Sequence, residues 1–352
     1  MVPLAEKLKK LSRAGWLYEK KESQIVQCYA CAHRCIIKPG RRGVCQMRCN
    51  ENGELFVPWG YVAAANVDPI EKKPLMHLLP GSDALTFGML GCNFHCDFCQ
   101  NWISSQALRD PASETSGSYI QEISSEELVN HAIRSGSDIV ASSYNEPLIT
   151  SEWAIEIFKL AKKNKLLTAY VSNGYATPEV LHALEPVLDA YKIDLKCFTD
   201  KKYRSLGGAL EEVKNTIQLA FELGMWVEIV TLVIPGFNDS PVELRDMADF
   251  INSVSPDIPW HVTAFHPMYK RDGDRTSAEI LQRAAEIGEE AGLHYIYAGN
   301  LPGRVGSLED TRCPNCGHTL IKRAGFLIRE NRVKPEGTCP DCGAAIAGIW
   351  QN

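Results

Sequence analysis

Three cysteines in the first third of the chain have the spacing of a metal-cluster loop. Residues 90–102 read LGCNFHCDFCQNW, which places Cys92, Cys96 and Cys99 in a C-x3-C-x2-C pattern. Three thiolates bind three irons of a [4Fe–4S] cubane and leave the fourth iron open to a small ligand. A zinc knuckle with His95 as the fourth ligand is the alternative, because structural zinc takes four ligands. The tight loop, the aromatic Phe98 before the third cysteine and the apolar run before the loop favour the cluster.

A second group of cysteines lies near the end of the chain. Cys313-Pro-Asn-Cys316-Gly and Cys339-Pro-Asp-Cys342-Gly form two matching C-x2-C knuckles. Paired knuckles are typical of a zinc ribbon, and residues 320–333 between them suit a short hairpin. The sequence therefore predicts a structural zinc here, with a second iron–sulfur cluster or a rubredoxin-like iron as the alternative.

A third group lies in the first fifty residues. A C-x2-C-x3-C-x9-C pattern supplies four ligands, which are Cys28, Cys31, Cys35 and Cys45. His33 or Cys49 is a possible replacement for one of them, and the turn at residues 40–43 brings Cys45 back to the others. Zinc and an auxiliary [4Fe–4S] cluster both suit thiolate ligands. The ligand type does not separate the two, and we expect zinc or another structural metal slightly ahead of the cluster.

The region that follows the central cysteines alternates short apolar runs with amphipathic segments. The expected strands are residues 84–90, 139–142, 167–171, 190–195, 226–234, 260–264 and 294–297. Repeated strand–helix units predict an α/β fold with a parallel sheet, closed into a partial or full (β/α) barrel. We expect three regions: a Cys-rich N-terminal region (1–82), the barrel (83–304) and a zinc-ribbon-like C-terminal region (305–352).

Helix boundaries carry their own signals. Ser124 and Glu127 form a capping box, and Gly136 ends the helix that follows. Thr177-Pro178 and Ser240-Pro241 each place a capping side chain before a proline at the first helical position. In such barrels the chemistry collects at the carboxyl ends of the strands, where the central cysteines lie.

Composition narrows the class of protein. The formal net charge of −6 opposes generic nucleic-acid binding, which needs a basic face. No stretch reaches the roughly 18 apolar residues of a membrane span, and the N-terminus has no signal-peptide pattern, so we expect a cytoplasmic protein without a membrane partner. In that compartment the thirteen cysteines are better metal ligands than disulfides. Cys197 stands alone in an apolar run and is expected to be a small core residue.

The cysteine loop on a β/α barrel resembles the radical S-adenosylmethionine (SAM) superfamily, and CNFHCDFCQN resembles its pyruvate formate-lyase activating enzyme branch. VDPIEKKPLMHLLPG (67–81), SYNEP (143–147), FHPMYK (265–270) and YAGNLPG (297–303) resemble the AmmeMemoRadiSam system radical SAM enzymes. The resemblance implies that SAM binds the open iron through its amino and carboxylate groups. One-electron reduction then breaks SAM and yields a 5′-deoxyadenosyl radical, which takes hydrogen from a substrate that the sequence does not identify.

The same resemblance implies a SAM pocket at the strand ends. The residues carried over to it are Phe98, Asn145, Glu146, Ser172, Asn173, Asp194, Lys196, Ile234 and His266. Residues 144–147 are similar in place to the segment that meets the methionyl amino group, but the two glycines of that segment are absent. Ser172 and Asn173 resemble the motif on the ribose and sulfonium side, Ile234 the element beside adenine, and His266 a histidine near the cofactor.

Two charged residues have support from spacing as well. Period-2 alternation puts Asp194 and Lys196 on one face of a strand, and paired charges inside a barrel are costly without a task. In the activating enzymes these positions serve a cation or the SAM carboxylate. The chain has Val171 where those enzymes have an acidic residue, which argues against a bound monovalent cation.

These patterns predict a radical SAM oxidoreductase. Its reaction is hydrogen abstraction from an unknown substrate, and the alternative is an activase that installs a glycyl radical on a partner protein. A non-catalytic metal-binding scaffold is the third class, which the open-coordination triad opposes. Expected partners are a flavodoxin or ferredoxin as electron donor, together with Memo-like and AMMECR-like proteins, and no nucleic acid.

Overall fold

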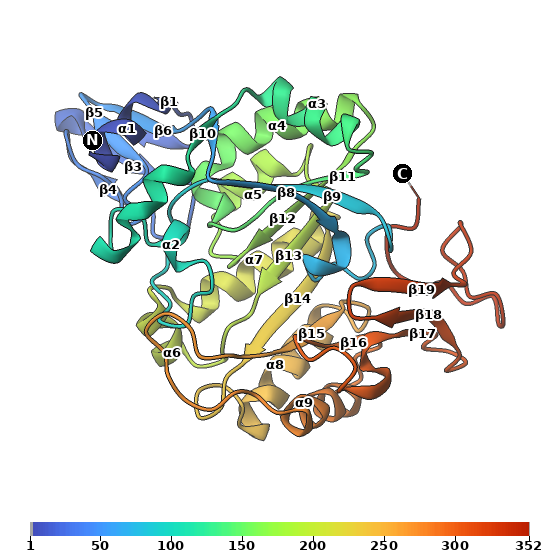
Figure 1. The fold of residues 1–352 in the computed structure, drawn as a ribbon. Helices are drawn as coiled ribbons and strands as arrows, with labels where there is room; N and C mark the ends of the chain where they lie inside the picture. Colours follow the sequence, from blue (N-terminus) through green and yellow to red (C-terminus); the bar gives the residue numbers. More distant parts are fainter. Residues whose placement is uncertain (1–2, 352) are drawn as a thin grey trace.

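The computed structural model describes residues 3–351 and has an open eight-stranded sheet at its centre (Figure 1). Its strand order is β16-β15-β14-β13-β12-β11-β9-β8; seven strands are parallel, and β8 pairs antiparallel with β9. The strands are β8 (Ala64–Pro69), β9 (Asp83–Gly88), β11 (Ile139–Ser142), β12 (Leu167–Ser172), β13 (Ala190–Asp194), β14 (Trp226–Val233), β15 (Trp260–Ala264) and β16 (Ile296–Gly299). Because β8 and β16 are the two unpaired edges, the sheet is a partial barrel.

The seven parallel strands lie where the sequence predicts them. β11 and β15 have the predicted bounds, and the others differ by two residues or fewer at either end. These strands are almost wholly buried, which is why they read as continuous apolar runs. The antiparallel β8 also joins this sheet, although the sequence assigns its residues to the N-terminal region.

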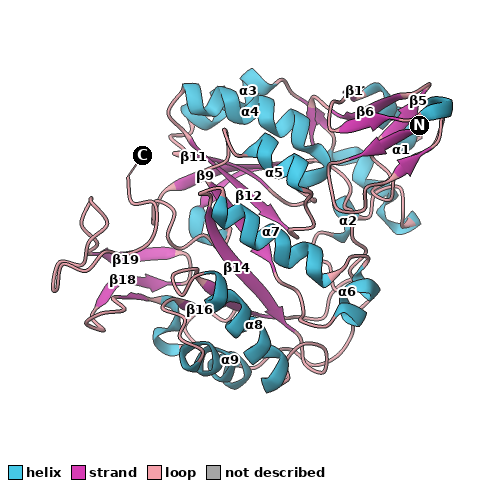
Figure 2. Ribbon diagram, turned by 180° about the vertical axis from the view of Figure 1, so that it is seen from behind, coloured by secondary structure: helices cyan, strands magenta, loops and turns pink. Residues whose placement is uncertain are grey.

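Helices cover the outer face of the sheet (Figure 2). They are α3 (Ser125–Arg134), α4 (Ser151–Lys163), α5 (Pro178–Leu184), α6 (Asp200–Leu206), α7 (Leu210–Glu222), α8 (Pro241–Val254) and α9 (Ala278–Glu290). The capping box of Ser124 and Glu127 is present, and Thr177 and Ser240 cap α5 and α8 as predicted. Within residues 3–351, no helix is both long and apolar enough to cross a bilayer.

The N-terminal region forms two small three-stranded sheets beside the cysteine loop (Figure 1). The elements are α1 (Leu4–Lys10), β1 (Ser12–Ala14), β2 (Tyr18–Lys20), η1 (Glu22–Gln24), β3 (Val26–Cys28), β4 (Ile36–Ile37), β5 (Cys49–Glu51) and β6 (Glu54–Pro58). Connecting elements are β7 (Tyr61–Val62), η2 (Ile70–Lys72), α2 (Trp102–Ser105), η3 (Pro111–Tyr119), β10 (Gln121–Glu122) and η4 (Pro147–Thr150). A buried ion pair joins this region to the barrel, with Arg48 2.6 and 2.7 Å from the carboxylate of Glu152 on α4.

The C-terminal region is a three-stranded antiparallel sheet packed near the amino ends of the barrel strands (Figure 1). It comprises η5 (Gly306–Glu309), β17 (Thr311–Arg312), β18 (Thr319–Ala324) and β19 (Leu327–Asn331). β18 and β19 form the hairpin that the sequence predicts between the two knuckles.

His77, from the segment between β8 and β9, joins this sheet to the barrel. Its Nδ1 lies 2.6 Å from the carbonyl of Ala347, and its Nε2 lies 2.6 Å from the hydroxyl of Tyr297. Burial lowers the pKa of His77 to about 4, so the ring is neutral: Nδ1 donates and Nε2 accepts. The hydroxyl of Tyr297 also lies 2.7 Å from Oγ1 of Thr311 on β17. A buried chain of hydrogen bonds therefore joins the barrel to the C-terminal sheet.

Glu228 on β14 lies under this junction and is fully buried. Its carboxylate accepts from the backbone N–H groups of Met76 and His77, the indole of Trp226 and the ring of His261. Burial opposes the charge, but the hydrogen bond and charge of His261 hold the pKa of Glu228 below its usual value. The carboxylate is therefore ionised and anchors four donors at once.

We expect Glu228→Ala to lower the free energy of unfolding by about 3–5 kcal/mol, because it leaves buried donors without an acceptor. Anaerobic denaturant titration followed by tryptophan fluorescence measures the effect. Glu222→Ala, at an exposed position at the end of α7, is the matched control and should change stability by less than about 0.5 kcal/mol. Equal stability of the two variants would contradict the anchoring role.

Candidate active site and metal centres

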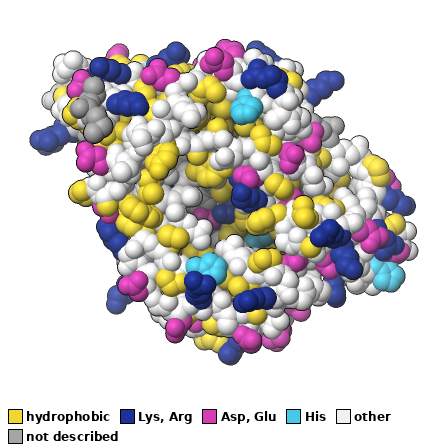
Figure 3. All heavy atoms as spheres, in the orientation of Figure 1, with side chains coloured by type: hydrophobic (Ala, Val, Ile, Leu, Met, Phe, Trp, Pro, Cys, Tyr) yellow, Lys and Arg dark blue, Asp and Glu magenta, His cyan; other side chains and the backbone are white. Residues whose placement is uncertain are grey.

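A cavity of about 380 Å³ opens inside the sheet at the carboxyl ends of its strands. All three central cysteines line it, together with residues that follow β11 and β12 and residues of β13 and β14. Lys72 to Pro74 on the β8 side and Asn300 after β16 line it as well, so the cavity reaches both free edges of the open sheet. Figure 3 shows the hollow near the middle of this face, with charged side chains beside it.

The cysteine loop is held by backbone and side-chain contacts on every side. The N–H of Met89 donates to Asn145, that of Gly91 to the carbonyl of Ser104, and that of His95 to the carbonyl of Leu206. Gly208 touches the ring of Phe94 so closely that a Cβ there would lie 2.4 Å from it. The loop that carries the thiols is therefore fixed by the fold before any metal binds.

The thiols of this loop suit an iron–sulfur cluster. Burial raises the pKa of Cys92 well above its ordinary value and that of Cys96 to about 12, so a metal charge is needed to hold them as thiolates. Asn93 is fully buried, and its Nδ2 has no hydrogen-bond partner in the described structure. A sulfur of a cluster bound beside Cys92 would accept a hydrogen bond from it. The residues present fit a [4Fe–4S] cluster held by Cys92, Cys96 and Cys99.

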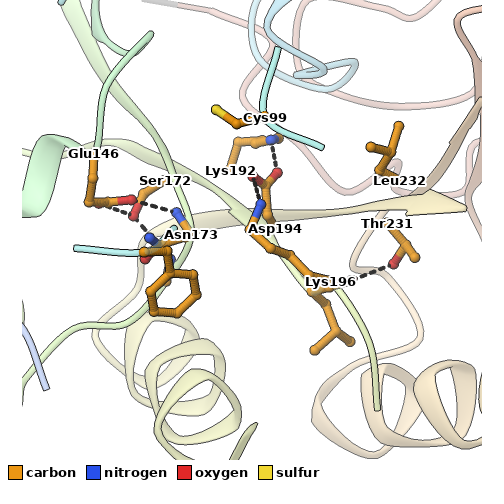
Figure 4. A network of polar contacts seen from close by, with 12 residues as sticks. Cys99, Glu146, Ser172, Asn173, Lys192, Asp194, Lys196, Thr231 and Leu232 are labelled. Atoms are coloured by element: carbon orange, nitrogen blue, oxygen red, sulfur yellow. Dashed lines mark hydrogen bonds and ion pairs between the residues drawn. The ribbon is translucent and has the colours of Figure 1, made fainter. Parts of the chain in front are cut away.

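Glu146 sits in the cavity wall behind this loop (Figure 4). Its carboxylate accepts from Ser172 Oγ at 2.7 Å, the N–H of Asn173 at 2.8 Å and the N–H of Leu148 at 3.0 Å. Burial raises the pKa of Glu146 to about 7 in spite of these donors. A cation in the cavity would stabilise its charged form, as the ammonium of SAM is expected to do.

Three charged side chains of the β13 segment form a second group (Figure 4). Asp194 lies between Lys196, whose Nζ is 2.8 Å away, and Lys192, whose Nζ also contacts it. Burial opposes the charge of Asp194, but Lys192 and Lys196 outweigh it and lower the pKa of Asp194 to about 2. Burial lowers the pKa of Lys192, and Asp194 opposes this shift. With both lysines protonated the group carries one net positive charge, which suits a carboxylate ligand.

The structure brings together most of the residues predicted for the SAM pocket. Those that line the cavity are Phe98, Asn145, Glu146, Ser172, Asn173, Asp194 and Lys196. Ile234 is packed in the core, and His266 lies after β15; neither is among the cavity-lining residues, whereas Val230 and Leu232 of β14 are. The roles of Ile234 and His266 at the cofactor stay predictions.

Sequence reasoning missed Lys192. The signal was available, because period-2 alternation puts residues 192, 194 and 196 on one face of the strand. The sequence places residues 144–147 near the methionyl group, but it does not show that the hydroxyl of Tyr144, a residue with a positive φ of 69°, accepts from Lys73 and Asn66. Only the pairing of β8 with β9 brings Lys73 and Asn66 within reach of this hydroxyl.

The C-terminal cysteines are gathered tightly. The sulfurs of Cys313, Cys316, Cys339 and Cys342 all lie within 4.8 Å of one another, with contacts of 3.6 and 3.8 Å across the two knuckles. Four thiolates at about 2.3 Å from one tetrahedral zinc are about 3.8 Å apart. The geometry fits a single ion, as the zinc-ribbon pattern predicts.

We expect the double variant Cys339→Ala/Cys342→Ala to lose about one zinc per chain and no iron, because four-thiolate sites are closed structural sites. Its melting temperature should fall, since ligand binding and folding of such a region are linked. Metal analysis by mass spectrometry measures the loss. Loss of about four irons would instead identify the quartet as a cluster.

The N-terminal cysteines lie close enough together to affect the pKa of one another. Burial raises the pKa of Cys31 well above its ordinary value, and the charges of Cys28, Cys45 and Cys35 raise it further. Burial raises the pKa of Cys49 in strand β5, and the charge of Cys45 adds to this shift. His33 points away from the quartet, with Nε2 3.1 Å from the carbonyl of Asn93 in the central loop. These mutual effects place Cys28, Cys31, Cys35 and Cys45 near one another, and their role as ligands of one metal site stays a prediction.

Comparison with known proteins gives related sequences along most of the chain. Residues 87–251 match the Radical SAM superfamily. The uncharacterized protein MJ0808 of Methanocaldococcus jannaschii is 38% identical over 338 residues, which cover 95% of this chain and 98% of that protein. The pyruvate formate-lyase-activating enzyme of Clostridium pasteurianum is 28% identical over 189 residues, covering 50% of this chain and 71% of that enzyme.

Among solved structures, a radical SAM methyltransferase from Sphaerobacter thermophilus aligns with a TM-score of 0.49 at 15% identity, over 64% of this chain and 70% of that one. The family match, residues 87–251, contains the cysteine loop. The region of the chain that carries the cysteine loop, residues 87–251, belongs to the radical SAM superfamily.

Proposed function

We propose that this protein cleaves SAM reductively and abstracts a hydrogen atom from a substrate held in the same cavity. The observation that carries the proposal is the convergence of three cluster-binding thiols, Glu146 and the Lys192–Asp194–Lys196 group on one cavity. When bound, the reduced cluster supplies the electron that breaks SAM into methionine and the 5′-deoxyadenosyl radical. Glu146 accepts from the SAM ammonium, and the positive β13 group holds its carboxylate.

The cavity has room for substrate at the open side of the barrel. Lys73 on the β8 side and Asn300 on the β16 side both line the cavity, and neither is assigned to SAM. Because β8 and β16 do not pair, a substrate group reaches the cavity through this edge without unfolding any sheet. The open edge admits a small molecule or a loop of another protein.

A glycyl-radical activase is the second candidate. The specific support is similarity to pyruvate formate-lyase-activating enzymes over about half of the chain. The finer motif resemblance points to the AmmeMemoRadiSam group, with Memo-like and AMMECR-like proteins as partners and a flavodoxin or ferredoxin as donor. Both candidates use the same cavity and differ in the hydrogen that is removed.

Deuterium transfer separates the two. The anaerobically reconstituted protein is reduced with dithionite in the presence of SAM and each candidate partner, and 5′-deoxyadenosine is analysed by mass spectrometry. A partner produced with α-deuterated glycine should pass one deuterium to 5′-deoxyadenosine if the protein is an activase. Transfer only from uniformly deuterated partner or from a small molecule indicates another substrate. Absence of any 5′-deoxyadenosine under all conditions would overturn the proposed function.

A further inference from the structure

Strand β8 ends the central sheet, and the backbone groups along its outer edge are unpaired. The N–H of Ser143, directly after β11, donates to the carbonyl of Phe87 on β9. Phe87 therefore bonds β11, and because backbone groups alternate along a strand, its register partner Ala65 makes no ladder bond to β9. The same alternation applies to Val67, two residues along. The N–H and C=O groups of Ala65 and Val67 point away from β9, and no other residue of the range 3–351 bonds them.

This edge lacks the features that usually protect an edge strand. An unpaired edge readily binds another extended chain, and proteins normally cover or shorten it. The opposite edge of the sheet, β16, has four residues and lies against η5. β8 has six residues, and its ladder with β9 runs through all of them without an irregularity. β10 pairs with β7, directly before β8, and leaves the edge of β8 uncovered. The edge is therefore available for strand pairing.

Alternate side chains of β8 reach the cavity. Nδ2 of Asn66 lies 3.2 Å from the hydroxyl of Tyr144, and a carboxylate oxygen of Asp68 lies 3.5 Å from the same hydroxyl. Tyr144 lines the cavity, so Asn66 and Asp68 are on the inner face of the sheet. Val67 is on the other face and is 36% exposed. A strand added to β8 continues this alternation, so every second side chain of the added segment lies at the rim of the cavity.

Two lysines make this rim positive. Nζ of Lys72 and Nζ of Lys73 lie 2.6 and 3.0 Å from the two carboxylate oxygens of Asp68, which leaves one positive charge. Lys73 is buried, and its Nζ also lies 3.3 Å from the hydroxyl of Tyr144. The side chain of Lys72 is half exposed, and both lysines line the cavity. The ammonium of Lys72 is therefore accessible to an acidic side chain of a bound segment.

We infer that the substrate of this cavity is a polypeptide, and that an extended segment of it pairs with the outer edge of β8. The backbone groups of Ala65 and Val67 bond the segment, as in other peptides that add a strand to a sheet. Lys72 pairs with an acidic side chain on the inner face of the segment, next to the cavity. The inference rests on the proposed function for the reaction, but the pairing itself requires neither SAM nor the cluster.

Selection from a phage-displayed library of random peptides tests the edge on the full-length protein under anaerobic conditions. Bound peptides should carry acidic residues at alternate positions. Val67→Pro removes the outward N–H and places a ring on the edge without removing a bond to β9. The affinity of the selected peptides should fall at least about fivefold in this variant. Val67→Thr keeps the N–H and a β-branched side chain, so it is the matched control and should bind within about twofold of wild type.

Two results of this experiment would overturn the inference. The first is a wild-type protein that selects no peptide, or selected peptides that bind Val67→Pro as tightly as Val67→Thr. The second is a wild-type dimer that Val67→Pro dissociates, because a second copy of this chain would then occupy the edge. Light scattering measures the oligomeric state, and thermal melting shows whether Val67→Pro folds.

Charge reversal tests the inference independently of the folding of Val67→Pro. Lys72→Glu should reverse the preference, so that selection yields basic residues at alternate positions of the peptide. Lys201→Glu makes the same change at an exposed position outside the cavity and should keep the acidic preference. An acidic preference that persists in Lys72→Glu would contradict the inference. A wild-type protein that binds peptides but makes no 5′-deoxyadenosine contradicts the proposed function alone, so the two failures are distinguishable.

Discussion

Replacing Cys92, Cys96 or Cys99 with alanine should abolish the formation of 5′-deoxyadenosine from SAM. Each substitution leaves two thiolates in the loop, which are too few to hold three irons of a cubane. His95 is not free to replace a lost thiolate. Its ring packs against Gly207, where a Cβ would lie 2.7 Å from Nδ1, and its backbone N–H donates to the carbonyl of Leu206. Chromatography of quenched anaerobic reactions measures the product, and each variant should lose about four irons relative to wild type.

Cys197→Ala is the matched control for these variants. Cys197 is fully buried directly after Lys196, and it belongs to the hydrophobic core and to none of the three cysteine groups. The substitution removes a buried sulfur without removing a ligand, so iron content and turnover should stay at the wild-type level. Full turnover in any of the three loop variants would overturn the assignment of the cluster.

Lys196→Ala should weaken SAM binding by at least about tenfold, because a charge-assisted contact contributes roughly 1.5–3 kcal/mol. Asp194→Ala should weaken it as well, since Asp194 fixes the positions of Lys192 and Lys196 and its loss leaves two ammonium groups without the carboxylate that they share. Equilibrium binding of SAM to the anaerobically reconstituted protein gives the dissociation constants. Iron content should be unchanged, because none of these side chains is a cluster ligand.

Lys201→Ala is the control for the charge change alone. Lys201 is exposed on α6, close to Lys196 in sequence but outside the cavity. Its loss should leave the dissociation constant within about twofold of wild type, as expected for a surface charge screened by solvent. If Lys196→Ala and Asp194→Ala both bind SAM as tightly as Lys201→Ala, the β13 group is a structural ion cluster.

Local sequence pattern alone predicted most of the barrel strands, the helix caps and the cysteine groups. The strands β11 and β15 are recognisable because buried parallel strands are continuous apolar runs, and the caps at Ser124, Thr177 and Ser240 are local hydrogen bonds. Cysteine spacing predicted three metal-ligand groups, since knuckles and loops bring ligands together over a few residues, and the structure gathers the four C-terminal sulfurs as that spacing predicts. The inward face of Asp194 and Lys196 followed from strand periodicity.

Contacts between residues far apart in the sequence determined the edge of the sheet, the outer part of the cavity and the links between the regions. The place of β8 in the central sheet, and with it the approach of Lys73 and Tyr144 to the cavity, depends on antiparallel pairing that no local pattern specifies. The buried links from His77 to Tyr297 and from Arg48 to Glu152 join residues more than one hundred positions apart. Metal class was likewise open in the sequence, because the same thiolates suit zinc and iron–sulfur clusters. Only the folded chain shows that the four C-terminal sulfurs lie within 4.8 Å of one another, the spacing that a single tetrahedral ion requires.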